Sequence, residues 1–235
     1  MSNSSFQFKQ FTVWHDRCAM KVGTDGVLLG AWAPVENSKR ILDVGAGTGL
    51  ISLQLAQRSE QADITAIEID EAAAAQACEN VARSPWADRI HVVCCDFSNF
   101  QSEIRFDLIV SNPPYFMDAL KCPGEQRRLA RHTDELNYEL LFHRSANLLQ
   151  DKGSVSIIIP AEAGKNVIDT AWKYKLFPYN CLRVYTKPDK PCRRLLLSFS
   201  FQEKKCVENE LCIETDQRQY TPEYIALTKD FYLKM

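Results

Sequence analysis

The tetrapeptide Asn112-Pro113-Pro114-Tyr115 follows a short apolar run that comprises Phe106 and residues 108–110. The run predicts a buried strand, and the two prolines must end it because proline donates no hydrogen bond to a sheet. Prolines also hold the backbone extended, so a carboxamide and an aromatic ring are fixed at the carboxyl end of the strand. Open α/β sheets bind their ligands at this edge. The tetrapeptide therefore indicates group transfer to a planar NH2 group, such as that of an adenine.

A glycine-rich turn follows an earlier predicted strand, residues 41–44. Asp43-Val44-Gly45-Ala46-Gly47-Thr48-Gly49 leads into an amphipathic helix expected over residues 49–58. This arrangement binds nucleotide cofactors, because glycines let backbone N–H groups approach a ligand and the helix N-terminus carries a positive dipole end. A dinucleotide fingerprint would require a small residue at Leu50, and the chain contains no P-loop sequence. The spacing G-x-G-x-G therefore favours S-adenosylmethionine over NAD.

Acidic residues also end the next two predicted strands. Glu68, in the strand over residues 64–69, lies 19 residues after Gly49, where an acid can accept hydrogen bonds from both ribose hydroxyls. Asp96 follows the strand over residues 90–95 and can accept from an adenine amino group. We expect the neighbours Ile69 and Phe97 to contact the cofactor as well. With Asp43, these acids predict a cofactor site across three successive strands.

The rest of the chain alternates between strand and helix signals without an internal linker, which predicts a single domain over residues 1–235. Its expected parts are an N-terminal extension (1–35), a catalytic core (36–201) and a C-terminal strand and helix (202–235). Other expected elements are a strand or hairpin within 6–22, a helix over 27–32 capped by Thr24 or Asp25, helices over 71–83 (capped by Asp70), 135–150 and 162–175, strands over 153–160, 180–186 and 194–201, and a last helix with Thr221 as cap and Pro222 at its first position. The joint 187–191 is short, so the strands it connects should be antiparallel.

Composition restricts the class of protein. Hydrophobic residues make up 46% and charged residues 25% of the 235 residues, typical of a globular domain. No apolar run is long enough to span a membrane, and the N-terminus lacks a secretory pattern. The nine cysteines form no CxxC pair, and the four histidines lack metal-ligand spacing. We therefore expect a cytoplasmic protein with reduced thiols, no metal and no membrane partner, and a monomer as the default state.

Charge is unevenly distributed although the formal net charge is only −2. Residues 67–107 carry eight acidic and three basic side chains, whereas residues 183–194 carry five basic side chains and one acid. Residues 121–132 are also basic. These loops are either solvated surface or a footprint for a polyanion. The candidate phosphate contacts are Lys121, Arg127, Arg128, Arg131, Lys187, Lys190, Arg193 and Arg194.

The order of elements resembles the class I methyltransferase fold, an α/β Rossmann-like fold. DVGAGTG at residues 43–49 is similar to the cofactor motif of that class, and SNPPY at 111–115 to the motif of enzymes that methylate an exocyclic or amide nitrogen. The resemblance implies a seven-stranded, mostly parallel sheet with the last strand antiparallel, helices on both faces, and S-adenosylmethionine as cofactor.

Both ends of the chain narrow the resemblance. Residues 9–33, 84–90 and 223–235 resemble the bacterial tRNA1(Val) (adenine-37-N6)-methyltransferase family. This resemblance implies a tRNA partner, with the adenine next to the anticodon as target. It also implies that residues 21–25 close over the cofactor, with Lys21 beside it and Thr24 at its carboxylate end.

The tetrapeptide suggests how each residue would act. Asn112, beside the cofactor, and the carbonyl of Pro113 would accept the two N–H bonds of the amino group, and Tyr115 would stack on the base. Other readings stay open, because a glutamine amide or a guanine N2 group offers the same NH2. The alternatives are a protein glutamine N5-methyltransferase, a ribosomal RNA guanine-N2 methyltransferase, and a cofactor-binding RNA chaperone without transfer activity.

Overall fold

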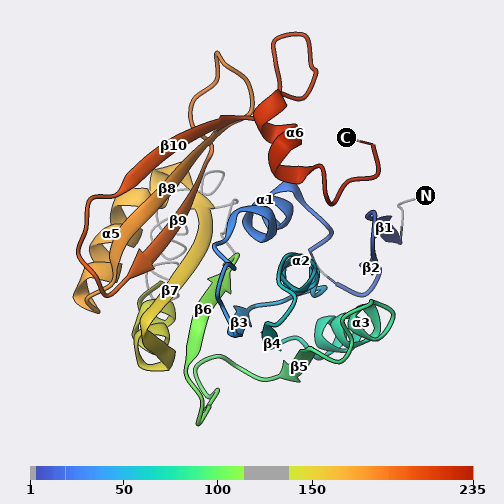
Figure 1. Ribbon diagram of the computed structural model, residues 1–235, viewed down its shortest axis with the longest axis vertical. Coiled ribbons are helices and arrows are strands. Elements are labelled where there is room, and N and C mark those ends of the chain that lie inside the picture. The colour runs from blue at the N-terminus through green and yellow to red at the C-terminus, as the bar shows by residue number, and fades with distance from the viewer. Residues whose placement is uncertain (1–3, 19, 114–137, 235) are drawn as a thin grey trace, which may run out of the picture.

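A central eight-stranded sheet organises the computed structural model, which describes residues 4–18, 20–113 and 138–234. The strand order is β10-β8-β9-β7-β6-β3-β4-β5 (Figure 1). β9 is antiparallel to both of its neighbours, and the other neighbouring pairs are parallel. The strands are β3 (Arg40–Val44), β4 (Asp63–Glu68), β5 (Ile90–Cys94), β6 (Phe106–Ser111), β7 (Leu149–Pro160), β8 (Phe177–Tyr185), β9 (Arg194–Ser200) and β10 (Val207–Cys212).

The predicted Rossmann-like arrangement is confirmed, and so is the antiparallel pairing of β8 with β9. The described sheet has one strand more than the seven expected, because β10 pairs in parallel with β8. Four of the six β10 residues are exposed, so the strand lacks the apolar alternation that marks a half-buried strand. Two cross-strand contacts hold it: Arg183 binds Glu208, and the Tyr185 hydroxyl donates to Glu210 over 3.1 Å.

Helices cover both faces of the sheet (Figure 1). One hydrophobic cluster contains residues of α1, α2, α3 and α6, and the other contains residues of α5 and of the helical stretch 138–148. The start of the helix predicted over 135–150 lies outside the described residues. The helices are α1 (Thr24–Trp32), α2 (Leu50–Arg58), α3 (Glu71–Ala82), α5 (Gly164–Lys173), preceded by the short 3-10 turn η2 (Ala161–Ala163), and α6 (Pro222–Thr228).

Two predicted helix caps are confirmed and one is wrong. Asp70 accepts the N–H of Ala73 over 2.8 Å at the start of α3, and Thr221 caps α6. α1 begins one turn earlier than predicted, with Gly23 in the cap position and no side-chain cap. Asp25 lies in the first turn, where its charge complements the helix dipole.

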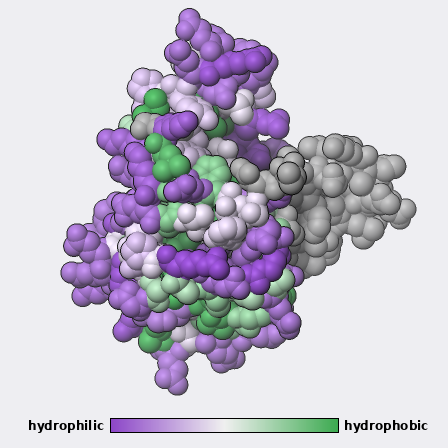
Figure 2. Space-filling view, turned by 90° about the vertical axis from the view of Figure 1, so that its right-hand side faces the viewer, coloured by the Kyte–Doolittle hydropathy of each residue, from purple (hydrophilic) through white to green (hydrophobic). Residues whose placement is uncertain are grey.

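The N-terminal extension forms the predicted hairpin. β1 (Ser5–Gln7) and β2 (Thr12–Trp14) pair in antiparallel fashion. Phe8 is buried and bridges to Tyr232 near the C-terminus, with ring centroids 5.8 Å apart. The two termini therefore lie on one side of the molecule (Figure 1), on a face that is mostly hydrophilic (Figure 2).

Candidate active site

Two cavities lie at the carboxyl ends of the central strands, and Gly45 lines both. The first has a volume of about 330 Å³ and the second about 210 Å³. The first includes Lys21, Thr24, Asp25, Gly47 and Asn112 in its lining, and the second includes Ile69, Asp96, Phe97, Pro113 and Leu140. The structure thus brings together residues that the sequence places on four separate strand ends and on the N-terminal extension.

The end of β6 separates the two cavities. Ser111 is paired with Val44 of β3, and its buried hydroxyl donates to the Val44 carbonyl over 2.9 Å. This bond holds the last residue of β6 against the end of β3, where the glycine loop begins. Asn112 is half-buried on the first cavity, and Pro113 is buried on the second. Pro114 and Tyr115 lie outside the described residues.

The glycine loop provides space rather than the N–H groups that we expected a ligand to meet. Gly45 and Gly47 have φ values of 74° and 55°, and a Cβ atom added to either would meet nothing within 4 Å. The N–H groups of Gly45 and Ala46 both donate to the carbonyl of Ile67 over 2.9 Å. The Gly47 N–H donates to Glu68 Oε2 over 2.8 Å. These three donors face the protein, so the loop presents an open backbone surface to the cavities.

Asp43 is a fully buried carboxyl group behind the glycine loop. Its Oδ2 accepts from the backbone N–H and the hydroxyl of Ser52 over 3.1 and 2.7 Å, in the first turn of α2. Gly49, with φ 80°, is the N-cap of that helix. Asp43 Oδ1 has no hydrogen-bond partner. Burial raises the pKa of Asp43 to about 6, the Ser52 hydrogen bonds oppose this, and the charge of Glu68 adds to it. Asp43 lines neither cavity, so its predicted cofactor role would be that of a fixed charge.

The other two acids differ in their positions. Glu68 is half-buried, and its Oε1 accepts the Asp70 N–H over 2.9 Å while Oε2 holds the loop. Each carboxylate oxygen keeps a further acceptor site, so the predicted ribose contact stays a prediction. Asp96 borders the second cavity directly, and its Oδ1 accepts the Ser98 N–H over 2.8 Å. Phe97 lines the same cavity, which suits a planar ring.

Arg194, which we predicted to contact phosphate, is instead paired with an acid in the wall of the first cavity. Arg194 Nε lies 2.8 Å from Asp25 Oδ2, and the two side chains are only 17% and 24% exposed. This geometry does not favour an RNA contact by Arg194, which stays a prediction. Lys190 is exposed and pairs with its neighbour Asp189, while Lys187 is half-buried and Arg193 exposed. Lys121, Arg127, Arg128 and Arg131 lie outside the described residues.

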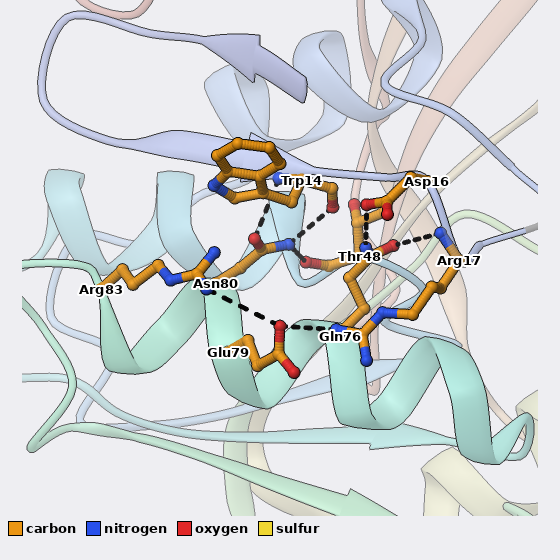
Figure 3. A network of polar contacts seen from close by, with 8 residues as sticks. All are labelled: Trp14, Asp16, Arg17, Thr48, Gln76, Glu79, Asn80 and Arg83. Carbon is orange, nitrogen blue, oxygen red and sulfur yellow. Dashed lines mark hydrogen bonds and ion pairs between the residues drawn. The ribbon is translucent and has the colours of Figure 1, made fainter. Parts of the chain in front are cut away.

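Sequence reasoning missed a buried polar network that fixes the N-terminal extension beside the site (Figure 3). Asn80 of α3 is 1% exposed. Its Oδ1 accepts the Trp14 N–H, and its Nδ2 donates to the carbonyls of Trp14 and Thr48, each over 2.9 Å. One turn earlier, Gln76 accepts the Arg17 N–H and donates to Asp16. Two carboxamides at i and i+4 on an alanine-rich helix were the available signal.

We expect Asn80→Ala to destabilise the fold and to weaken cofactor binding. The change removes one buried and two partly buried hydrogen bonds and takes a partner from the Trp14 N–H and from two carbonyls, at a cost of roughly 2–4 kcal/mol. Thr48 lines the first cavity and residues 20–25 continue from the extension, so S-adenosylmethionine affinity should fall too. Urea unfolding and calorimetry measure the two effects. Asn209→Ala, on the exposed edge strand β10, is the matched control; equal stabilities of the two variants would contradict the prediction.

Other features of the described residues concern metals, thiols and membranes. Within residues 4–18, 20–113 and 138–234, no group of three His, Cys, Asp or Glu side chains could hold a metal ion. The cysteines described are all free thiols, and burial raises the pKa of Cys18 and Cys181 to about 11. None of the helices in this part of the chain is long and apolar enough to cross a membrane.

Comparison with known proteins agrees with this geometry. The family model of the methyltransferase small domain matches residues 22–171. A Bacteroides fragilis protein named tRNA1(Val) (adenine(37)-N6)-methyltransferase is 55% identical, and one of the same name from Pectobacterium carotovorum is 45% identical. The first alignment covers all of both chains, and the second covers all of this chain and 96% of the relative.

Solved structures are similar in fold at low sequence identity. A predicted O-methyltransferase, Atu636 from Agrobacterium tumefaciens, has a TM-score of 0.69 and 18% identity, over 88% of this chain and 96% of that one. The glycopeptide N-methyltransferase MtfA, complexed with S-adenosylmethionine, has a TM-score of 0.57 and 13% identity, over 77% of this chain and all of that one. Both likenesses support the Rossmann-like fold.

Proposed function

The chain belongs to the tRNA1(Val) (adenine(37)-N6)-methyltransferase family, and we propose that it methylates N6 of adenine 37 in tRNA1(Val) with S-adenosylmethionine. The observation that carries the proposal is the end of β6, where Asn112 and Pro113 lie between two cavities joined at Gly45. A methyl donor and an amino group could meet at this strand end. The proposed setting is a cytoplasmic monomer that binds the anticodon loop.

The residues around the cavities fit this cofactor. Side chains are lacking at Gly45 and Gly47, where the loop faces open space, and the buried carboxyl of Asp43 has an oxygen without a partner. A buried anion favours a ligand that carries positive charge. Lys21 and Thr24 would hold the carboxylate end of the cofactor. Glu68 would hold the ribose, with Asp96, Ile69 and Phe97 around the adenine. When bound, the cofactor supplies a methyl group activated by its sulfonium.

The remaining task of the chain is to prepare a weak nucleophile. The lone pair of an adenine N6 is delocalised into the ring. Asn112 Oδ1 and the carbonyl oxygen of Pro113 would accept its two N–H bonds, which holds the nitrogen in a more tetrahedral shape with the lone pair free. The same oxygens stabilise positive charge that develops on the nitrogen. The product nitrogen is acidic and loses its proton to solvent, so alignment supplies most of the catalysis. Tyr115, outside the described residues, would stack on the base.

Target choice among rival substrates tests the proposal. The protein is incubated with labelled S-adenosylmethionine and, separately, with bulk tRNA, ribosomal RNA or release-factor protein, and the products are digested to single units. Label in N6-methyladenosine from tRNA is expected. Label confined to glutamine or to guanine would assign one of the rival activities instead, and cofactor binding without any transfer would favour the RNA chaperone.

Charge reversal in the basic β8–β9 loop tests the proposed RNA contact. We expect Lys187→Glu and Arg193→Glu each to weaken tRNA binding and to lower the slope of log K against log salt concentration by about 1, because each removes one phosphate contact. Filter binding at several salt concentrations measures the slope. Lys152→Glu, at the opposite, amino end of the sheet, is the control. An unchanged slope in both loop variants would return these side chains to the solvated surface.

A further inference from the structure

A third hollow with an aromatic lining lies beside the first cavity. It has a volume of about 690 Å³ and is formed by β1, the ends of β8 and β10, α6 and the C-terminal residues. Thr24 lines both this hollow and the first cavity, so the two are neighbours across the start of α1. Figure 1 shows α6 beside α1. We call this hollow the tyrosine groove, after Tyr220, Tyr224 and Tyr232 in its wall.

Aromatic side chains run from solvent into the core at this groove. Tyr220 is 48% exposed, and its ring centroid lies 5.1 Å from that of Tyr224. The Tyr224 hydroxyl is hydrogen bonded to Tyr232, whose ring is stacked on the buried Phe8. Burial raises the pKa of both inner tyrosines above the ordinary value of 10.0. The ring of Tyr220 is therefore accessible to a ligand, and the buried aromatic rings behind it support it.

The backbone around Tyr220 is fixed before any ligand binds. Tyr220 bridges to Glu214 in antiparallel fashion. The next residue, Thr221, caps α6 and donates its hydroxyl to the Cys212 carbonyl over 2.5 Å. A ring held in this way loses little conformational entropy when a planar ligand stacks on it. These backbone contacts distinguish Tyr220 from a tyrosine on a mobile loop tip.

The groove borders the basic β8–β9 loop. The Glu214 N–H donates to the Thr186 carbonyl over 3.1 Å, and Lys187 follows directly. Neighbouring strands lie about 4.8 Å apart, so Tyr220 is roughly two strand spacings from the start of this loop. Lys234 also lines the groove, whereas Glu214 is an acid in its wall. Aromatic faces beside cations suit a nucleic acid, because bases stack and phosphates are neutralised.

We propose that the tyrosine groove binds single-stranded RNA, with a nucleotide next to the target adenine stacked on Tyr220. This inference rests on the proposed function, because the target base would enter at Asn112, on the cavity that shares Thr24 with the groove. A base turned into the active site leaves its neighbours unstacked. Tyr220 replaces the lost stacking for one of them, which holds the strand in place while the adenine is turned in.

The test uses the full chain and an anticodon stem-loop RNA with 2-aminopurine next to the target adenine. Stacking on Tyr220 should quench the fluorescence when the RNA binds. Tyr220→Ala should lose most of that quenching and raise KM for tRNA about tenfold, the effect of losing one stacked base. Its kcat should stay within about twofold and its S-adenosylmethionine affinity unchanged. Tyr220→Phe, which keeps the ring, should behave as the original protein does.

Tyr179→Ala provides the matched control, because Tyr179 lies near the opposite end of β8. We expect its KM for tRNA and its quenching to be unchanged. Methylation of tRNA with the original KM and quenching in Tyr220→Ala would overturn the groove proposal and leave the proposed function standing. Absence of tRNA methylation by the original protein would instead overturn the proposed function. If circular dichroism shows that Tyr220→Ala does not fold, Tyr220→Leu is measured in its place. It must then show the same rise in KM for tRNA.

Discussion

Replacing Asn112 by alanine is expected to lower the rate of methyl transfer by about 10²–10³-fold, by analogy with the loss of one preorganised hydrogen-bonding group from an oxyanion hole. S-adenosylmethionine affinity should stay within a few-fold. Asn112 is half-buried at the border of the first cavity, and the hydrogen bond from Ser111 to Val44 holds the strand end beside it. Asn112→Ala should therefore remove an acceptor without moving the glycine loop. Single-turnover kinetics and calorimetry separate the two quantities.

The Asn112 variant needs a control at an asparagine that lines neither cavity. Asn99→Ala, in the exposed turn after β5, should change neither rate nor affinity. Loss of cofactor binding in Asn112→Ala by more than about tenfold would mean that Asn112 acts mainly as a cofactor ligand. An unchanged rate would remove it from the catalytic residues.

The second large effect concerns the buried carboxyl of Asp43. Its pKa in the folded protein is about 6, above the ordinary value of 3.8, because burial disfavours the charged form. The folded state therefore holds the proton more strongly than the unfolded state. The stability that this contributes is complete below pH 3.8 and is lost as the pH rises through 6. A difference of about two pH units corresponds to about 3 kcal/mol.

Asp43→Asn should remove this pH dependence. The free energy of unfolding of the original protein, measured by urea, should fall by about 2.5 kcal/mol more than that of the variant between pH 4 and pH 8. Asp151→Asn, at an exposed position of β7, should leave the profile unchanged. Parallel profiles for the original protein and Asp43→Asn would show that this carboxyl does not titrate in the folded state as inferred.

Cofactor binding provides a second readout of the same charge. S-adenosylmethionine carries positive charge, so its affinity for the original protein should rise as the pH increases from 5 to 7 and Asp43 ionises. The variant should show a flat profile over this range. S-adenosylhomocysteine, which lacks the sulfonium charge, should respond less than S-adenosylmethionine in the original protein. Equal pH profiles for the two ligands in the original protein would contradict a role for the fixed charge.

Much of the central sheet could be predicted because its strands are short apolar runs that end in glycine, proline or an acid. β3, β4 and β6 lie within one or two residues of their predicted bounds, and the caps at Asp70 and Thr221 are local patterns. β10 was predicted only as part of a C-terminal strand and helix. It joins the sheet through backbone pairing and charged side chains, which leave no apolar alternation.

The site could be predicted only in part, for a physical reason. The acids and glycines that follow strands come together because parallel strands end at one edge. Contacts between distant segments leave no comparable pattern. Arg194 and Asp25 are 169 residues apart and pair at the cavity wall, and Asn80 joins Trp14 to Thr48 through carboxamide bonds. The inward direction of the loop N–H groups likewise depends on Ile67, Glu68 and their hydrogen bonds.

Mapping of the modified nucleotide tests most directly whether the protein methylates one amino nitrogen in tRNA. Unmodified tRNA1(Val) is incubated with the protein and S-adenosylmethionine, digested with a ribonuclease, and its fragments are analysed by mass spectrometry. We expect one added methyl group, on N6 of adenine 37, and none in a transcript with guanine at that position. A methyl group on another nucleotide, or none in tRNA while a protein glutamine is methylated, would contradict it.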